Sequence, residues 1–536
     1  MPERPVRRRL VRMLGSMPLI ADYARRLRIE GIINRQCPSR SNAHLTHGQV
    51  ALVVIANRLI APRAMYHLLD WAQHWAVREL FGVDPNQLND DRLGRCLDAL
   101  APHLDRLQGA VTAVAVREFD LDLSQLHWDL TSVTLQGEYP PEEQDPAHPR
   151  PAHGFGGEPG CKQVRVGELV TADGGVPVWH RGFDGQQADV GTVAATMQAV
   201  RRQVPLPECL VIGDSKLLSK EVITRLRDQG LHFLAPLPKS AELDEQFLGL
   251  EPASWQPLDY LAQRQERLPE AERTQYLGQE VPWEWTHPRT GAVEVFRRLF
   301  VISSEEQATC RKVRSQQMAR AQADLARVAA GLGKRQLKTA AKVEVKVGQV
   351  LKARRVSALY RVSVTGEPGA PTLEWAVDTA ALARAEALDG YYVLLCSWPP
   401  EKAGSSSLLA RWKGEATIER RFSDWKGPLH LRPVFVTNNA RMAALLLLLH
   451  LALMIFCLLE REARRRLAEQ GRKKVERLLA AHVAAVPTGA NILRAFEYLM
   501  LIVEEDEHGR TCEMSESRPQ QEDLWRLLGL QSPVWR

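Results

Sequence analysis

The stretch Leu126-His-Trp-Asp-Leu-Thr-Ser-Val-Thr-Leu135 decides the fold class, because it is the first clear strand after a long helical region. It is rich in β-branched and aromatic residues, which favour strands. Strand alternation places Asp129 on the same face as Thr131 and Val133. An unpaired carboxylate is costly on a half-buried strand, so a simple surface charge explains Asp129 poorly. Asp129 is therefore a candidate site residue.

The residues after this strand alternate between strand and helix patterns. The expected elements are the strands Val164–Thr171 and Val176–Phe183, the helix Val190–Gln203, the strand Cys209–Asp214, the helix Ser219–Gln229 and the strand Leu231–Pro236. Asp173-Gly174-Gly175 is a good hairpin turn between the first two strands. The short apolar run before Asp214 is typical of a buried strand that presents a site residue at its C-terminal end.

This order of elements predicts an α/β fold with a mixed sheet of the ribonuclease-H-like type. The first and fourth strands are neighbours in that fold. Asp129 and Asp214 are therefore expected side by side at the centre of the sheet. The alternative for Asp214 is that it only caps the following helix, and in isolation the two explanations are equally good.

A third carboxylate lies in Arg411–Lys426, a stretch without proline that is expected to form one helix. Trp412, Glu419 and Lys426 are seven residues apart, which places them on nearly the same helical face. A solvated amphipathic surface is the commoner explanation for such a pattern. Glu419 becomes a site candidate only when it is considered together with Asp129 and Asp214.

The chain is long enough for several domains. The expected organisation is a helical domain with a basic arm at 1–118, an α/β core at 119–240 and 386–460, an inserted β-rich domain at 241–385, and a C-terminal helical tail at 461–536. Strand-like pieces between polar segments indicate the insertion, and the strand Tyr391–Ser397 marks the return of the core.

The N-terminal domain is expected to be entirely helical. Thr46 can cap a helix over Val50–Ile60, a second helix is expected at Ala64–Leu80, and Asn89 can cap a third. Short helices behind an arginine-rich arm are compatible with a helix-turn-helix DNA binder, and equally with a small helical bundle. The arm favours DNA.

The net charge of +6 is distributed unevenly. Residues 1–40 contain ten arginines and three carboxylates, and residues 311–355 contain thirteen Lys or Arg and two carboxylates. Such blocks indicate a polyanionic partner, most plausibly nucleic acid. For either block alone, a solvated basic face is an equally good explanation.

Cysteine spacing and hydropathy indicate the compartment. The eight cysteines are scattered without C-x-x-C spacing, which argues against a zinc site or a disulfide scaffold and favours reduced thiols in a cytoplasm. No apolar run that would form a signal peptide follows the basic N-terminus. The seventeen-residue apolar run Ala443–Leu459 is slightly short for a membrane span, so a buried core helix is the preferred interpretation.

Two strand aspartates and one helix glutamate together predict a site for divalent metal ions. Phosphodiester chemistry uses hard oxygen ligands that hold two Mg²⁺ ions about 4 Å apart. Carboxylates meet this need without the thiol or redox chemistry of softer ligands. The residue types and their order on the elements thus indicate metal-dependent chemistry on nucleic acid.

With these residues in place, the chain resembles bacterial insertion-sequence transposases of the DDE type, in the branch with a Y-x2-R-x3-E-x6-K signature. Glu419 and Lys426 keep the E-x6-K spacing, and the stretches Ile418–Phe422 and Arg432-Pro433-Val434 match its flanks. Asp129 and Asp214 match the two aspartates. Trp412 stands at the signature's tyrosine position and Glu415 at its arginine position. The similarity covers roughly residues 45–460.

The resemblance implies a catalytic and metal-binding triad of Asp129, Asp214 and Glu419, two Mg²⁺ ions with Mn²⁺ as a substitute, and strand transfer of exposed 3′-hydroxyls. It also implies binding of double-stranded DNA, both terminal inverted repeats and target, by a homodimer associated with the nucleoid, without a membrane.

The resemblance also assigns DNA contacts. Lys426 would contact a terminal phosphate, and Trp412 would stack on an unpaired base or simply lie in the core. Arg411 or Arg420 would replace the missing signature arginine. Glu415 would reverse the charge at that position and is a rival or auxiliary metal ligand. Hairpinned transposon ends are a further feature that the branch often uses.

Two alternatives of other classes remain at this point. One is a catalytically inactive DNA-binding protein derived from such an enzyme. The other is a ribonuclease-H-like nuclease with another role. Metal-dependent cleavage of DNA that carries terminal repeats separates them from a transposase.

Overall fold

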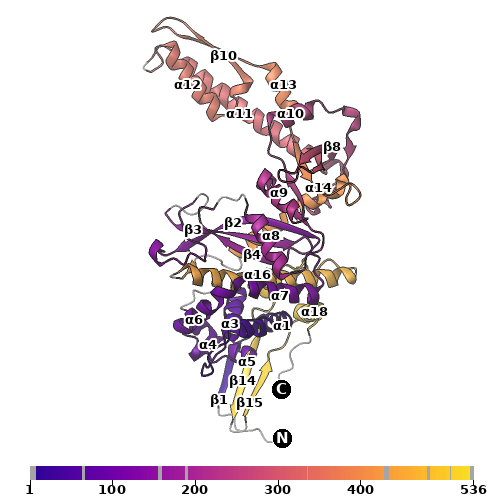
Figure 1. Cartoon of the computed structure of the whole chain (residues 1–536). Coiled ribbons are helices and arrows are strands. Elements are labelled where there is room, and N and C mark those ends of the chain that lie inside the picture. The colour runs from indigo at the N-terminus through magenta and orange to yellow at the C-terminus, as the bar shows by residue number, and fades with distance from the viewer. Residues whose placement is uncertain are drawn as a thin grey trace. The chain divides into compact units, whose positions relative to one another are not determined.

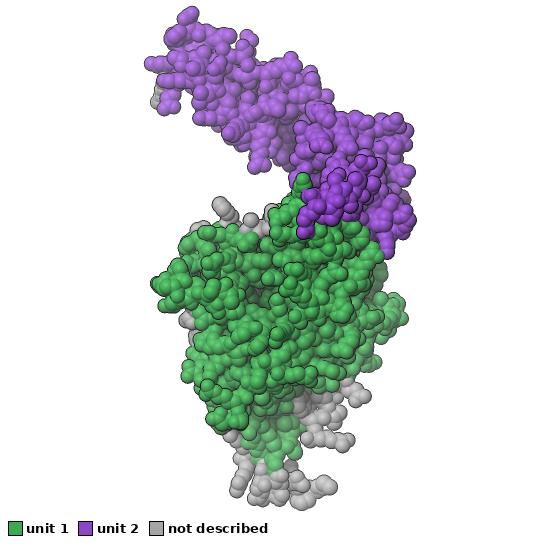
Figure 2. Space-filling view, viewed as in Figure 1, with its two compact units in different colours: residues 1–233, 411–536 green, residues 234–410 purple. Residues whose placement is uncertain are grey.

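A computed structural model of the chain describes residues 8–62, 67–154, 160–187, 191–334, 336–414, 416–427, 434–436, 438–479, 483–506 and 509–530 (Figure 1). The chain divides into two compact units, which Figure 2 shows in different colours. Unit 1 comprises residues 1–233 and 411–536, and unit 2 comprises residues 234–410.

The N-terminal part of unit 1 is helical apart from one strand. Its elements are β1 (Arg8–Met13), α1 (Met17–Arg26), α2 (Ile29–Gln36), α3 (His47–Ile60), α4 (Leu68–His74), α5 (Val77–Phe81), α6 (Asp90–Leu100) and α7 (Leu104–Phe119). The predicted caps are confirmed: Thr46 forms a capping box with Gln49, and the Asn89 side chain accepts a hydrogen bond from the Arg92 N–H.

The prediction of one helix over Ala64–Leu80 is wrong in the described residues, which exclude 63–66. Trp75 is extended and separates α4 from α5. It forms a parallel bridge with Met13, and the Ala76 N–H donates to the Met13 carbonyl at 2.9 Å. A long-range backbone pairing thus overrides local helix propensity.

The sheet of unit 1 has the mixed order that the sequence predicts. Its strands are β2 (Gln125–Gln136), β3 (Lys162–Thr171), β4 (Pro177–Phe183), β5 (Leu210–Ile212) and β13 (Val434–Phe435). The order is β4-β3-β2-β5, with β3 antiparallel to both neighbours, β5 parallel to β2 and β13 also parallel to β2. The helices α8 (Thr192–Gln203) and α9 (Lys220–Asp228) connect β4, β5 and β6 (His232–Pro236). The predicted pairing of the first and fourth strands is confirmed.

The helix α16 (Asn439–Glu469) is the core element of unit 1. It packs against α3, α6 and α7 on one side and against β4 on another (Figure 1). Its stretch Ala443–Leu459 is apolar around nearly the whole circumference, as expected for a helix that is covered on all sides. The helix is long and apolar enough to cross a membrane, but its apolar window is entirely buried within the protein. The prediction that Ala443–Leu459 forms a buried core helix is confirmed.

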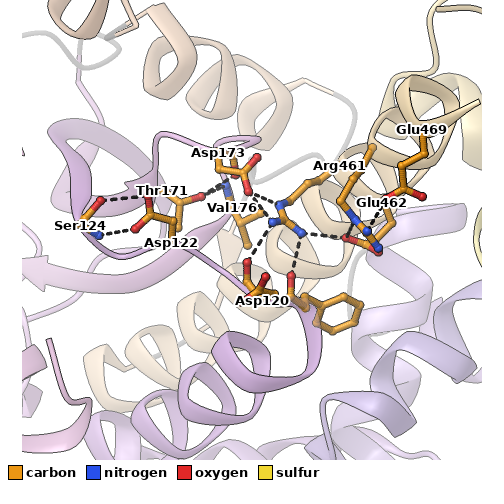
Figure 3. A network of polar contacts seen from close by, with 11 residues as sticks. Asp120, Asp122, Ser124, Thr171, Asp173, Val176, Arg461, Glu462 and Glu469 are labelled. Carbon is orange, nitrogen blue, oxygen red and sulfur yellow. Dashed lines mark hydrogen bonds and ion pairs between the residues drawn. The ribbon is translucent and has the colours of Figure 1, made fainter. Parts of the chain in front are cut away.

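Arg461 fixes the end of this apolar stretch to two other elements (Figure 3). Its guanidinium donates to the backbone carbonyls of Phe119 and Asp120 at 2.8 and 3.1 Å, and to the Asp173 carboxylate. Glu462 accepts a further hydrogen bond at 2.8 Å. The end of α7 and the β3–β4 turn are thereby tied to α16.

The C-terminal segment also belongs to unit 1 and contains strands as well as helices. Its elements after α16 are α17 (Gly489–Ala495), β14 (Met500–Asp506), β15 (Gly509–Met514) and α18 (Pro519–Leu527). β14 pairs with β1 on one side and β15 on the other, and buries Leu501 and Val503. The segment 461–536 is therefore not purely helical, because the β14–β15 hairpin completes its pairing with β1 from the other end of the chain.

Unit 2 contains a second strand arrangement and an elongated helical part. Its strands β6, β12 (Tyr391–Cys396), β9 (Val293–Ser303), β8 (Tyr276–Thr286) and β7 (Gln256–Pro257) lie in that order. Its helices include α10 (Ala241–Leu248), α11 (Ser304–Ala330), α12 (Ala340–Ala353) and α13 (Thr379–Ala387). The segment 241–385, expected to be β-rich with a basic helix at Glu305–Leu332, has that helix as α11 and further helices as well.

From here on, we use the term arm for residues 304–377, which are distinct from the arginine-rich arm at the N-terminus. It consists of α11, α12 and the hairpin of β10 (Tyr360–Thr365) and β11 (Thr372–Val377). Its own small core is formed by apolar side chains such as Leu325, Val343 and Leu351. The basic block predicted at 311–355 lies in the arm.

Candidate active site

Asp129 lies on β2, next to the strand that ends before Asp214. The parallel register pairs His127 with Ile212, so the two carboxylates follow at equivalent positions two residues later. Asp129 is half-buried, and its Oδ1 accepts a hydrogen bond from the Leu130 N–H at 2.7 Å. Burial raises the pKa of Asp129 to about 6, against the effect of this hydrogen bond. The negative charges of Asp214 and Glu419 raise it further, which shows that both lie within electrostatic range.

Asp214 serves as a cap and also faces the neighbouring strand. Its Oδ1 accepts a hydrogen bond from the Lys216 N–H at 3.0 Å, and its Oδ2 lies 3.7 Å from the Lys216 Nζ. A small hollow in the surface is lined by Trp128, Asp129, Asp214 and Lys216. The two explanations considered for Asp214, a cap and a site residue beside Asp129, are therefore compatible.

The prediction that Arg411–Lys426 forms one helix is wrong. The chain forms α14 (Ser405–Lys413) and α15 (Ala416–Lys426), with Gly414 between them. A Cβ atom on Gly414 would lie 3.4 Å from Cε1 of the His127 ring, so the break is also a close approach to β2. Because of this break, the seven-residue spacing does not place Trp412 on the helical face of Glu419. Glu415 lies outside the described residues.

The helix α15 packs on β2 and α16 through one face and exposes the other. The side chains of its buried face are Ile418, Arg421, Phe422 and Trp425. Glu419 is exposed, as are Arg420 and Lys426. Glu419 is therefore not part of the face that packs on the sheet.

Arg421 is fully buried and holds α15 in place through hydrogen bonds or ion pairs with four partners. Its Nε donates to the Gly175 carbonyl at 3.1 Å and its second amino group to the Gly174 carbonyl. It also pairs with Asp424 at 2.9 Å and with the buried Glu460 of α16 at 3.3 Å. The turn predicted between β3 and β4 is thus the docking point for the helix that carries Glu419.

The four residues predicted to bind DNA have different surroundings. Arg411 donates to the Gln125 Oε1, and Arg420 forms an ion pair with Glu460. Trp412 is half-buried, and the Lys413 Nζ lies 4.8 Å from the centre of its ring. Lys426 is exposed at the end of α15. The flank Arg432-Pro433 lies outside the described residues.

A divalent metal ion fits the chemistry of this site. The three carboxylates offer only hard oxygen donors, and their mutual repulsion, seen in the raised pKa of Asp129, is the effect that a bound cation would remove. The described residues contain no group of three or more His, Cys, Asp or Glu side chains gathered closely enough to hold an ion. The three carboxylates are therefore within range of one another without forming a closed ligand cluster.

Sequence reasoning missed two contributors to this region. Lys216 follows Asp214 by two residues and places a cation beside it. Arg421 lies on the apolar stripe of α15, between Ile418 and Trp425, and that spacing was readable in the sequence. Its partner Glu460 could not be predicted, because it is 39 residues away on another helix.

Comparisons with known proteins identify the family of the chain. A family model described as transposase DDE domain matches residues 129–455, starting at Asp129, and one described as a domain of unknown function, DUF4277, matches residues 10–105. The first match spans more than half of the chain, so the chain belongs to the transposase DDE domain family. It is a DNA transposase of the DDE class with a ribonuclease-H-like mixed sheet. DDE transposase domains act on DNA and generally use divalent metal ions.

Two solved structures are similar to the chain at low scores. A piggyBac transposase synaptic complex with hairpin DNA is 9% identical, with 90% of this chain and 76% of that chain covered and a TM-score of 0.35. A Mos1 transposase paired-end complex with left transposon end is 11% identical, with 34% and 59% covered and a TM-score of 0.15. No curated protein matches the chain.

Proposed function

We propose that this transposase cuts the ends of its element and joins their 3′-hydroxyls to target DNA, with Asp129, Asp214 and Glu419 as catalytic residues. These carboxylates would hold two Mg²⁺ ions, for which Mn²⁺ can substitute. The observation that carries the proposal is the parallel register of β2 and β5, which brings Asp129 and Asp214 to equivalent positions on neighbouring segments. Burial raises the pKa of Asp129, and the charges of Asp214 and Glu419 add to the effect. Such coupling is typical of catalytic carboxylates.

The protein residues supply orientation and charge around the reacting phosphate. Bound divalent ions activate the attacking oxygen and stabilise the leaving oxygen. Lys216 offers an ammonium group beside Asp214, where a phosphate oxygen would carry negative charge. Lys426 contacts a terminal phosphate, and Trp412 stacks on an unpaired base. The excision of hairpinned ends, common in the branch, is compatible with such a base contact.

Arg411 and Arg420 contribute to DNA binding in this proposal, but each has a protein partner. Arg420 is bound to Glu460 and Arg411 to Gln125. DNA would have to exchange with these partners, or share the guanidinium groups with them. Both arginines are therefore expected to contribute less to affinity than the exposed Lys426.

The domain roles and the assembly belong to the same proposal. Residues 1–118 bind DNA, residues 119–240 and 386–460 form the catalytic core, 241–385 is the insertion, and 461–536 supports the first domain. Two copies act on paired terminal inverted repeats as a homodimer, in the cytoplasm on the nucleoid. The exposed cations of the arm and the N-terminal arginines support DNA as the partner.

The test uses the full chain and DNA that carries the inverted repeats flanking its gene. Asp129→Asn, Asp214→Asn and Glu419→Gln should each reduce cleavage and strand transfer at least 1000-fold, because each removes an oxygen ligand, while DNA binding stays. Glu142→Gln removes an exposed carboxylate away from the site and should have no effect. Cleavage is measured on gels with Mg²⁺ or Mn²⁺.

Three outcomes would contradict this proposal. Normal cleavage by the three variants would show that the site is elsewhere. DNA binding by the wild-type chain without any cleavage, with either metal, would favour the inactive DNA-binding protein. Cleavage without preference for the terminal repeats would favour a nuclease with another role.

A further inference from the structure

A basic pocket lies in the N-terminal part of unit 1, where α3 and α6 begin. These two helices pack against each other. Its basic and titratable lining residues are Arg40, His44, His47, Arg92 and Arg95. None of the described residues that line the pocket is an Asp or a Glu. A pocket with this composition selects anions.

Arg92 is the key residue of this pocket, because its charge is buried without a counter-charge. Only 8% of the residue is exposed. Its guanidinium donates to the Leu45 carbonyl at 2.8 Å and to the His47 Nδ1 at 3.2 Å, and its Nε has no partner among the described residues. Both partners are neutral acceptors.

The electrostatics around Arg92 are unfavourable in the isolated chain. Burial lowers the pKa of Arg92, and the nearby Arg95 adds to the effect. Burial, Arg92 and Arg95 together lower the pKa of His47, so its ring is neutral near pH 7 and accepts from Arg92. A buried cation without an anion is costly. Two hydrogen bonds to a loop can be made by an uncharged side chain, so they do not explain an arginine here.

The entrance of the pocket also carries positive charges without counter-charges. Arg40 and Arg95 are exposed, and neither has an ion-pair partner in the part of the chain that the structure describes. With Arg92 they form three guanidinium groups around one space. Arginine is suited to such a role, because its planar fork binds phosphate oxygens in pairs and remains charged.

We propose that this pocket binds a phosphate group of a DNA strand, away from the catalytic carboxylates. The proposal rests on DNA as the partner of the chain, but not on the roles given to Asp129, Asp214 and Glu419. Phosphate contacts of this kind fix the position of a protein on the duplex without reading sequence. The bound phosphate would supply the negative charge that Arg92 lacks.

The first test measures the affinity of the full-length chain for duplex DNA by fluorescence anisotropy, at NaCl concentrations from about 50 to about 300 mM. The double variant Arg40→Gln with Arg95→Gln keeps the buried residue and should fold normally. Its log–log salt slope should be smaller by up to about 0.9, because the contact with one phosphate is weakened or lost. Arg117→Gln, an exposed arginine of α7 outside the pocket, should leave the slope nearly unchanged.

A second measurement distinguishes DNA phosphate from free phosphate. Inorganic phosphate is compared with chloride at equal ionic strength for its effect on the unfolding temperature of the wild-type chain, the double variant and Arg92→Met. A specific site predicts stabilisation by phosphate in the wild type and its loss in both variants, because a ligand that binds the folded chain stabilises it. Arg92→Met should also lower the DNA salt slope by about 0.9.

The outcomes are separable. An unchanged DNA salt slope in the double variant and in Arg92→Met overturns the proposal. An unchanged slope with a phosphate effect that the variants lose assigns the pocket to a free anion and also overturns the DNA assignment. A reduced slope supports it, with or without stabilisation by free phosphate. None of these measurements depends on cleavage, so failure of the catalytic assignment is recognised separately.

Discussion

Two histidines and a glutamate form a buried polar cluster between the sheet and α16. The rings of His180 and His450 lie 4.8 Å apart, and the His450 Nδ1 is 3.0 Å from the Glu168 Oε2. The His180 Nδ1 is 3.0 Å from the Gln108 Oε1. Burial lowers the pKa of both histidines, to about 3 for His450, and raises that of Glu168. Burial therefore favours the uncharged form of all three side chains in the folded protein.

This cluster predicts a loss of stability on acidification. As pH falls through 6.5, the ordinary pKa of histidine, the unfolded chain protonates both histidines, whereas the folded chain protonates them only at lower pH. Glu168 acts in the opposite direction, because burial raises its pKa in the folded chain. Two histidines outweigh one glutamate, so the free energy of unfolding from this cluster falls by up to about 1.4 kcal/mol per pH unit as pH decreases.

The test compares His180→Gln with the wild type in urea unfolding at several pH values between 5 and 6. The variant removes one titrating group from the cluster, so its pH slope should be smaller by about 1.4 kcal/mol per pH unit. His74→Gln, an exposed control, should keep the wild-type slope. Equal slopes for His180→Gln and the wild type would show that His180 is not held neutral.

Residue-level prediction from the sequence succeeded where one element carries the signal. Asp129 and Asp214 were identifiable because each interrupts an apolar or alternating strand pattern. Glu168 and His450 were not paired in advance, because they are 282 residues apart and only packing brings them together. The roles of the three proposed catalytic carboxylates stay predictions.

At the scale of elements, the contact between the β3–β4 turn and α15 depends on a glycine. Gly175 has a φ of +59°, and a Cβ atom there would lie 2.4 Å from the Thr417 Cγ2. Both facts require glycine, the first for the turn and the second for the close approach of the helix. The turn was predicted from the sequence, whereas its role in docking α15 was not.

Gly175→Ala should displace α15 and reduce DNA cleavage by roughly 10- to 100-fold, because small misplacements of catalytic groups are costly. Gly230→Ala is the matched control: its φ is +66°, but nothing lies within 4 Å of the added atom. Both variants should lose about 1–2 kcal/mol of stability from backbone strain. Cleavage is compared at a temperature where both are folded.

A second substitution tests the mechanism of this effect. Thr417→Ala removes the atom that the new methyl group would meet, so it should restore part of the cleavage in Gly175→Ala. Equal cleavage by Gly175→Ala and Gly230→Ala would show that the position of α15 does not matter. The same result would weaken the case for Glu419.

Element boundaries were predicted well wherever a local cap or turn defines them. Thr46, Asn89 and the turn at Gly174-Gly175 acted as expected. The breaks at Trp75 and Gly414 were missed. Both occur where a residue meets a distant strand, Met13 in one case and His127 in the other, and no local propensity records such a contact.

At the scale of the whole molecule, the distribution of cations predicts a second DNA contact in unit 2. Eight basic residues of the arm are exposed and have no ion pair among the described residues; these are Lys312, Arg320, Lys334, Lys338, Lys342, Lys346, Lys352 and Arg355. Lys342 and Lys346 are one turn apart on α12, and Lys338 lies just before its start. They form a row of positive charge.

Lys338→Gln, Lys342→Gln and Lys346→Gln together should reduce the salt slope of DNA binding by up to about 2.7 if each lysine contacts a phosphate. The control combines Arg327→Gln and Arg354→Gln, whose charges are opposed by Asp324. It should change the slope less than the triple variant. Equal slopes for the triple variant and the wild type would assign these lysines to a solvated face.

The sequence by itself determined the order of strands and helices from β2 to β6, the caps at Thr46 and Asn89, and the strands that carry Asp129 and precede Asp214. These features depend on periodicity and turn chemistry over a few residues, which a sequence displays directly. It also located the basic blocks and the buried core helix at 443–459, because charge and hydropathy are properties of composition.

Only the tertiary structure decided which distant segments meet. The pairing of β1 with β14, the burial of Arg421 against Glu460 and the pocket around Arg92 join residues that are far apart in the chain. Such contacts depend on how whole elements pack, since a buried charge or an unpaired strand edge can be satisfied by many partners. Packing selects one of them, and no local pattern encodes that choice.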